Sequence, residues 1–273
     1  MNRSVPVLAG VSLLALVECR NGSVTGTTSA SASSSSGSGT GGGPVEVTCP
    51  VKVGEPTAMK VSFIMSAQWF PPLPMQPAPS GVTVKVCSRE DEACATPADT
   101  QITNPGGIAA FTVPTPPPVG FDGYFELTGG NPQAIWPLLW YESNPIEASG
   151  SEAPLALTPA LLGALEKLGG AELDPSRGLV GARIIGCNRL QGAGFTLEVS
   201  GADAQSKIGY FVSNVPDKTA TSTDSSGLAY ALNLPPGKVT LVTRDPRSGV
   251  RLGKLDVWIR AGFMTETFFY PTP

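Results

Sequence analysis

Residues 81–87 read GVTVKVC, a glycine followed by strict alternation of apolar and polar side chains. This period of two places Val82, Val84 and Val86 on one side of an extended chain, which predicts a strand with one buried face. Residues 194–200 read GFTLEVS and repeat the same pattern. The chain therefore carries two copies of one strand-forming unit, and this repeat decides the fold that we expect.

A second pair of matching segments lies downstream of these strands. Residues 103–110 read TNPGGIAA and residues 223–230 read TDSSGLAY. In these segments Asn104 or Asp224 caps a tight turn through its side chain, and a glycine supplies the positive φ that closes the turn. An apolar strand, a proline and a further strand follow each turn. The second copy has a longer insertion, residues 201–222, between its strand and its turn.

This order of elements resembles the carboxypeptidase-regulatory-like and transthyretin-like β-sandwich families. Residues 178–245 carry the better match, with an opening strand from Gly178 to Ile185 and the sequence LPPG at 234–237 as the family's Pro-x-Gly. Residues 56–130 match more loosely because proline-rich stretches interrupt them. The resemblance implies compact seven-stranded antiparallel sandwiches used in adhesion, stalks and ligand-binding accessories, and it implies no particular chemistry.

The composition also favours an all-β fold. Glycine and proline are abundant, at 32 and 27 residues, while hydrophobic residues reach 41%, so the chain has core-forming residues punctuated by many turns. We predict two Ig-like or prealbumin-like antiparallel β-sandwiches, at residues 45–150 and 177–273. Residues 151–176 are expected to form a linker with a short helix.

The helix is predicted from its ends and from an apolar stripe. Thr158 is a suitable N-cap, Pro159 fits the first helical position, and Gly169 and Gly170 end the helix. Four leucines share one face, so we expect this face to pack against one or both sandwiches. The stripe consists of Leu161, Leu162, Leu165 and Leu168.

Residues 1–19 are predicted to be a signal peptide. Residues 5–17 form an apolar stretch that is long enough for a signal-peptide core and too short to cross a bilayer. The stretch ends in LVEC at 16–19, which resembles the lipobox of bacterial lipoproteins and implies acylation of Cys19. Glu18 stands where the lipobox has a small residue, so cleavage to a secreted or periplasmic protein is the alternative.

Residues 20–44 are dominated by serine, glycine, threonine and alanine. A segment of this composition has little to bury, which predicts a disordered tether. Together with the acylated cysteine, the tether predicts an exported protein that a lipid anchor (palmitate among its acyl chains) holds at the cell envelope. The expected location is the outer membrane.

The chain contains no histidine and has a net charge of −4. Histidine is the commonest transition-metal ligand and the usual general base near neutral pH, so Ser-His-Asp, Cys-His and histidine-containing metal sites are excluded. Transthyretin-like hydrolases and intradiol dioxygenases depend on such histidines. The absence of a basic run excludes nucleic acid as a partner. We predict no enzyme activity, cofactor or metal; a Ser-Lys or carboxylate mechanism stays open but has no support.

Four cysteines follow Cys19. Cys87 and Cys94 bracket a charged loop that leaves a strand, and in an oxidising compartment this spacing favours a disulfide between them. Cys49 and Cys187 are then left over, and they either pair with each other or stay free. A site built from four thiolates is disfavoured because no Cys-x-x-Cys occurs.

Four aromatic residues suggest a ligand-binding face. Exposed aromatic platforms bind sugars, so a carbohydrate-binding accessory module is one hypothesis; the alternative is that the rings fill the ends of small cores. We favour a non-enzymatic envelope lipoprotein that acts as a structural or binding module, with an unknown envelope protein or glycan as its partner. The four aromatic residues are Trp69, Trp136, Trp140 and Tyr141.

Overall fold

Strands dominate the structure, a computed structural model that describes residues 56, 58–70, 77–131, 134–186 and 192–270. The described residues fall within one compact unit, residues 42–273, and contain seventeen strands and one helix. The all-β fold class predicted from the sequence is confirmed. The signal peptide, the tether, Cys19, Cys49 and Cys187 lie outside the described residues.

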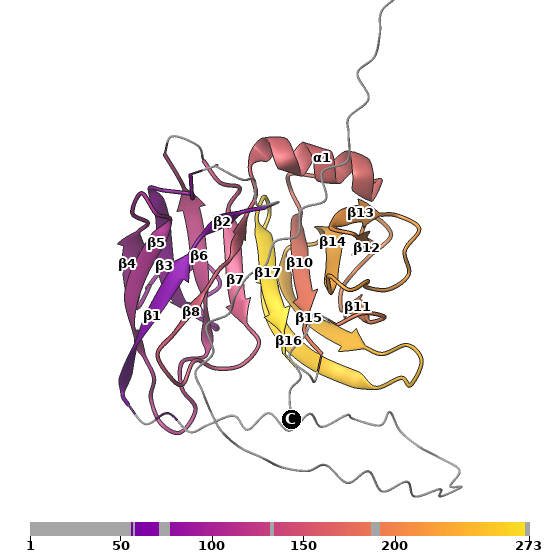
Figure 1. The fold of residues 1–273 in the computed structure, drawn as a ribbon. Coiled ribbons are helices and arrows are strands. Elements are labelled where there is room, and N and C mark those ends of the chain that lie inside the picture. Colours follow the sequence, from indigo (N-terminus) through magenta and orange to yellow (C-terminus); the bar gives the residue numbers. More distant parts are fainter. Residues whose placement is uncertain (1–55, 57, 71–76, 132–133, 187–191, 271–273) are drawn as a thin grey trace, which may run out of the picture. The chain divides into compact units, whose positions relative to one another are not determined.

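The N-terminal half is a sandwich of two sets of strands (Figure 1). One set has the order β5-β1-β8 and consists of Ile108–Pro114, Lys60–Ser66 and Gly150–Glu152. The other has the order β7-β6-β3-β4 and consists of Leu138–Glu142, Gly123–Gly129, Val82–Ser88 and Asp99–Ile102. Val82, Val84 and Val86 are fully buried, as the alternation predicts.

The C-terminal half repeats this order of pairing. One set of strands, β14-β10-β17, consists of Leu228–Leu234, Gly178–Ile184 and Met264–Phe269. The other, β11-β15-β16, consists of Thr196–Val199, Gly237–Arg244 and Arg251–Ile259. The predicted insertion contributes a hairpin of β12 and β13, which extends the sheet beyond β14 and consists of Lys207–Val212 and Val215–Asp217.

The strands of the two halves meet in one sheet. β17 pairs in parallel with β7, with Thr265 opposite Leu139 and Glu266 opposite Trp140. We call this ladder the seam. It joins both halves into a nine-stranded sheet of order β13-β12-β14-β10-β17-β7-β6-β3-β4, in which β7 and β17 lie side by side (Figure 1). Parallel pairing also links β1 to β8 and β10 to β17, so the halves depart from purely antiparallel sandwiches.

The nine-stranded sheet is covered on both faces. One core lies between it, β1, β5 and the helix, and the other lies between it, β15 and β16. Strands buried on both faces lose the alternation of apolar and polar residues. All seven residues of β14 and all six of β17 are accordingly buried.

The threonine that begins each copy of the turn motif makes the same two hydrogen bonds in both halves. The Thr103 hydroxyl donates to the carbonyl of Pro79 at 3.0 Å and accepts the amide hydrogen of Val82 at 3.0 Å. The Thr223 hydroxyl donates to the carbonyl of Gly192 at 2.7 Å and accepts the amide hydrogen of Phe195 at 3.0 Å. Each threonine thus ties its turn to the start of the neighbouring glycine-led strand.

The turns themselves have the predicted chemistry. The Asn104 side chain accepts the amide hydrogen of Gly106 at 2.9 Å, and the Asp224 carboxylate accepts that of Ser226 at 2.8 Å. Gly107 and Gly227 take positive φ angles of 75° and 65°, which residues with a side chain adopt less readily. The repeat found in the sequence is therefore a repeat of structure.

The helix α1 spans Pro159–Gly169, and Gly170 follows it with a φ of 71°, as its sequence predicts. Leu162 is buried and Leu165 packs against the first core, whereas Leu168 is 47% exposed, so the predicted stripe is narrower than four leucines. The helix lies across one end of the nine-stranded sheet (Figure 1). Across the described ranges, no helix has the length and apolar character needed to span a membrane.

Candidate functional site

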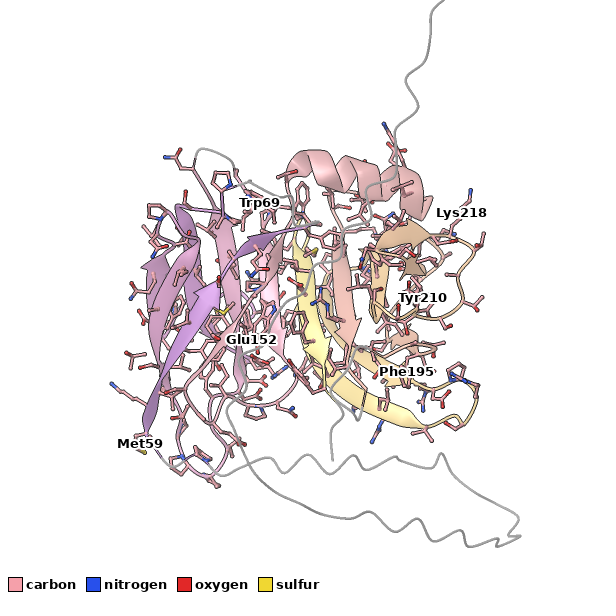
Figure 2. All side chains as sticks on the ribbon, viewed as in Figure 1. Met59, Trp69, Glu152, Phe195, Tyr210 and Lys218 are labelled. Atoms are coloured by element: carbon pink, nitrogen blue, oxygen red, sulfur yellow. A yellow bond between two sulfur atoms is a disulfide. The ribbon has the colours of Figure 1, made fainter. Side chains whose placement is uncertain are left out.

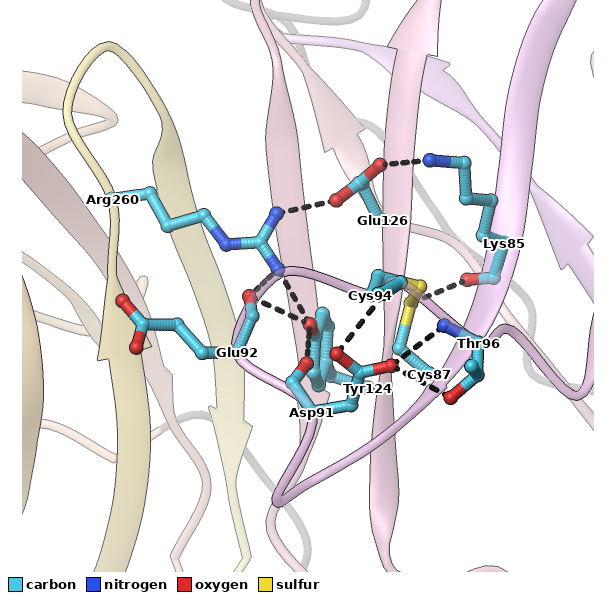
Figure 3. The surroundings of a disulfide bond; sticks show 10 residues. Lys85, Cys87, Asp91, Glu92, Cys94, Thr96, Tyr124, Glu126 and Arg260 are labelled. Atoms are coloured by element: carbon cyan, nitrogen blue, oxygen red, sulfur yellow. Dashed lines mark hydrogen bonds and ion pairs between the residues drawn. A yellow bond between two sulfur atoms is a disulfide. The ribbon is translucent and has the colours of Figure 1, made fainter.

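The predicted disulfide between Cys87 and Cys94 is present, and both cysteines are buried (Figure 3). It closes residues 87–94, which we call the disulfide loop. The Asp91 carboxylate accepts the amide hydrogens of Ala95 at 3.0 Å and Thr96 at 2.9 Å. These hydrogen bonds, that of Thr96 first, lower the pKa of Asp91. Asp91, the middle one of three acidic residues in this loop, therefore caps the backbone.

The disulfide loop docks onto the C-terminal half through Arg260, which follows β16 (Figure 3). The Arg260 guanidinium pairs with the Glu126 carboxylate, donates to the carbonyl of Glu92 and lies over the Tyr124 ring. Glu126 is 5% exposed and also binds Lys85 at 2.8 Å. Burial raises the pKa of Tyr124 to about 12, so its hydroxyl stays protonated.

A second arginine, Arg89, also bonds the N-terminal half to the C-terminal half. Arg89 donates to the carbonyl of Asp256 at 2.7 Å, and its own carbonyl accepts the indole hydrogen of Trp258 at 2.7 Å. The Trp258 amide in turn donates to the Tyr141 hydroxyl at 3.1 Å. Because these bonds cross between halves, we call the contacts of Arg89 and Arg260 the junction.

Two glutamates of the seam strands, and Glu152 of β8, have raised pKa values. Glu266 of β17 is 5% exposed, and its carboxyl oxygen accepts the amide hydrogen of Leu155 at 2.8 Å. Burial raises the pKa of Glu266 to about 8 and that of Glu152 to about 7. Burial and the neighbouring Glu152 also raise the pKa of Glu142 well above its usual range. A carboxyl in this setting favours its neutral form.

The Glu266 carboxyl is bonded to a segment whose strands pair with the N-terminal half. Residues 150–157, which we call the strap, include β8 and β9; the strand β9, Leu155–Ala156, pairs in parallel with β2, Gln68–Trp69. Arg183 is close enough to lower the pKa of Glu266, but within the described ranges the two side chains form no ion pair. The Arg183 guanidinium instead lies 5.0 Å from the centre of the Phe268 ring.

A hollow of about 210 Å³ lies between α1 and the segment that leads into β10. Apolar side chains from both elements line it, together with Trp136, Glu166, Asp174 and Arg177. The indole nitrogen of Trp136 is buried and has no hydrogen-bond partner among the described residues.

The four predicted aromatic residues do not form one surface. Trp140 and Tyr141 are fully buried and point into different cores, so neither ring offers a face to a ligand. Trp69, at the end of the molecule that carries α1 (Figure 2), is 6% exposed and donates its indole hydrogen to the carbonyl of Pro77 at 2.8 Å. A four-residue platform is therefore wrong. Trp136, which is partly buried, is the one of the four that lines the hollow.

The charged residues of the seam and the junction were not predicted from the sequence. Glu126 and Glu266 are single acidic residues in the segments YFELT and MTETF. Acidic residues are rarely buried unless they are paired or neutral, so Glu126 between Phe125 and Leu127 was an available signal, whereas Glu266 lies between two threonines. Arg260 carried no such signal because it follows its strand.

Comparisons with known proteins give only remote similarity. The chain matches no family model and no curated protein. The shaft pilin SpaA from Lactobacillus rhamnosus GG is 11% identical, with 78% of this chain and 98% of that chain covered and a TM-score of 0.25. The Bacillus anthracis TIE protein is 12% identical, with 78% and 34% covered and a TM-score of 0.25. A streptococcal ancillary pilin is 10% identical, with 80% and 64% covered and a TM-score of 0.24. At these values the fold rests on the strand pairing described above.

Proposed function

We propose that this chain is a non-enzymatic module of the bacterial cell envelope with a structural or binding role, such as adhesion or protein interaction. The observation that carries the proposal is the way in which the two sandwich halves are joined. They share the nine-stranded sheet and are bonded again at the junction by Arg89 and Arg260. Domains move relative to each other unless their interface is large and apolar. Halves joined in this way suit holding a fixed binding surface better than closing around a substrate.

The buried glutamates fit a structural role better than a catalytic one. Perturbed carboxyl groups often mark active sites, so Glu142, Glu152 and Glu266 need an explanation. Glu266 lines a cavity of about 50 Å³ whose other walls are mostly apolar. The Glu266 carboxyl is bonded to the strap, because it accepts the amide hydrogen of Leu155.

The proposed location at the cell envelope rests on the predicted signal peptide and on the predicted tether. A lipid on Cys19 would hold the folded unit near the membrane, and the tether of residues 20–44 would set its distance from the surface. The outer membrane is the proposed location. The carboxypeptidase-regulatory-like resemblance belongs to the same proposal, because it is a resemblance to sandwiches used in stalks and adhesion.

The anchor is tested by replacing Cys19 with serine. We expect the unchanged protein to fractionate with membranes and to have an intact mass that begins at Cys19 with added acyl groups. Cys19→Ser should lack the acyl mass and leave the membrane fraction, because serine provides no thiol for acylation. Cys187→Ser is the matched control and should stay in the membrane fraction. Recovery of the unchanged protein in the cytosol would refute the proposed function.

A further inference from the structure

The cavity that Glu266 lines lies between the strap, α1 and the nine-stranded sheet, and we call it the apolar cavity. Its volume of about 50 Å³ is more than the room that one water molecule needs. Cavities with apolar walls stay dry and take up apolar molecules. The apolar side chains of the wall come from the strap, from α1 and from four strands of the sheet, and they include Leu155, Leu165, Leu179, Phe211, Leu232 and Met264.

Gly181 of β10 leaves part of this space free. It lies in a central strand, opposite Glu266 of β17, and its φ is outside the left-handed region. A Cβ atom on Gly181 would come no closer than 3.9 Å to a neighbouring atom, Sδ of Met264, so crowding does not require a glycine there. Glycine weakens the interior of a strand, and it often marks a place that a ligand approaches closely.

Glu266 supplies a hydrogen-bond donor to the apolar cavity. The side chain is 5% exposed, and its Oε2 accepts the amide hydrogen of Leu155 at 2.8 Å. Its Oε1 has no hydrogen-bond partner in the described part of the chain and is not among the fully buried atoms. Burial raises the pKa of Glu266 to about 8, so the carboxyl is neutral at neutral pH. With Oε2 accepting, the proton belongs on Oε1.

Arg183 of β10 also lines the apolar cavity, and it is a half-buried cation without a counter-charge. It forms no ion pair or hydrogen bond with the residues that the structure describes, and its guanidinium lies 5.0 Å from the centre of the Phe268 ring. Its Nε is sealed from solvent, whereas its terminal nitrogens keep accessible surface. Arginine is rarely buried unless it is paired, so this arrangement favours a bound anion.

From this arrangement we infer that the apolar cavity binds a small carboxylic acid with an apolar chain, whose carboxylate pairs with the terminal nitrogens of Arg183 and accepts a hydrogen bond from Glu266. Both bonds are charge-assisted, which makes them stronger than bonds between neutral groups. The chain of the acid then lies against the leucines and in the space beside Gly181. This inference goes beyond the proposed function, because it assigns a small ligand to the module.

Other ligand classes fit this wall less well. An amine would face the Arg183 cation, and an alcohol or a hydrocarbon would leave that cation without a counter-charge. A sugar would bury its hydroxyl groups against apolar side chains. The acidic neighbour of Glu266 is Glu152 of β8, which itself faces Glu142 of β7. Burial raises the pKa of Glu152 to about 7 and that of Glu142 well above its usual range, so neither repels an anion strongly at about pH 6.

The test is isothermal titration of the exported protein, purified in detergent, at about pH 6, where the acids are ionised. The ligands are hexanoate and phenylacetate, with hexanol, hexylamine and a short peptide that ends in leucine as comparisons. Arg183→Met removes the cation and keeps an apolar stem, and Gly181→Val fills the cavity with a side chain that suits a strand. Each should weaken binding of the acids about tenfold or more.

Arg244→Met is the matched control, because Arg244 is a strand arginine that pairs with Glu198 at 2.8 Å and does not line the apolar cavity. It should bind the acids as the unchanged protein does. The melting temperature reports the folding of each variant. If either Arg183→Met or Gly181→Val fails to fold, the other decides.

The inference is supported if an acid binds about tenfold or more tightly than hexanol and if this binding weakens in the two cavity variants and not in Arg244→Met. It is overturned if neither acid binds, if hexanol or hexylamine binds as well as hexanoate, or if all variants bind equally. Binding of the peptide and of neither acid also overturns it. Because the titration uses purified protein, a failure here leaves the membrane location intact, and a cytosolic location refutes the proposed function whatever the titration shows.

Discussion

Replacing Glu266 with glutamine is expected to raise the free energy of unfolding at pH 8 by about 4 kcal/mol and to have little effect near pH 5. Glutamine keeps an oxygen that accepts the Leu155 amide hydrogen and has no charge to bury. At pH 8 the folded unchanged protein either buries the charge of Glu266 or keeps its carboxyl protonated, and both cost free energy. The unfolded chain ionises the same carboxyl in water without this cost.

The predicted gain in stability of Glu266→Gln at pH 8 follows from the raised pKa of Glu266. Glu266 has a pKa of about 8 in the folded protein against an ordinary value of 4.5, and burial is the main cause. Below pH 4.5 the carboxyl is neutral in both states and imposes no penalty. As the pH rises from 4.5 to 8 the unfolded state loses its proton first, so the folded state becomes progressively less stable. Glu152, with a pKa of about 7, adds to the same trend.

The measurement is urea unfolding of the unchanged protein, Glu266→Gln and Glu198→Gln at pH 5 and pH 8. The unchanged protein should be clearly more stable at pH 5, and Glu266→Gln should lose most of this difference. Glu198, whose side chain is 53% exposed, should behave like the unchanged protein. Equal stability of the unchanged protein at both pH values would show that Glu266 does not resist ionisation.

Replacing Arg260 with methionine should lower the free energy of unfolding by about 3–5 kcal/mol. The change leaves Lys85 as the one remaining counter-charge of the Glu126 carboxylate among the described residues, and it removes one of the donors to the carbonyl of Glu92. An unpaired buried charge costs more than the pair contributes, so Arg260→Met combined with Glu126→Gln should recover part of the loss.

Lys85→Met is the matched control for this experiment. The Lys85 side chain is 33% exposed, so water replaces much of what it supplies to Glu126, and a smaller loss is expected. Unfolding in urea would be followed by tryptophan fluorescence. If Arg260→Met cost no more than Lys85→Met, the junction would contribute little to holding the halves together.

The local parts of the fold were predictable because their causes are local. The alternation in residues 82–86 reports a buried face, and the Thr-Asn/Asp-x-x-Gly motif specifies its turn through side-chain hydrogen bonds and a positive φ. The ends of α1 and the Cys87–Cys94 pair follow from spacing in the same way. Each of these features involves residues close together in the chain.

The seam was not predictable because it depends on tertiary pairing. β7 and β17 are separated by more than a hundred residues, and the sequence of neither strand identifies its partner strand. For the same reason Trp140 and Tyr141 resembled an aromatic cluster on a surface. Pairing with β17 places them in the middle of a sheet, where both become buried.

The candidate site was predictable only in part. Trp136 was identified from the sequence by its residue type, and it lines the hollow together with Glu166 and Asp174. Those carboxylates come from α1 and from the segment before β10, and nothing in the spacing of the three residues indicates that they line one hollow. The packing of α1 across the sheet brings them together.

The most direct test of the fused architecture is calorimetric unfolding of the protein. Because the seam and the junction bind the halves into one unit, we predict a single transition whose calorimetric and van't Hoff enthalpies agree. Two resolved transitions, each with the enthalpy of about half the chain, would contradict this and would mean that the two sandwiches unfold independently.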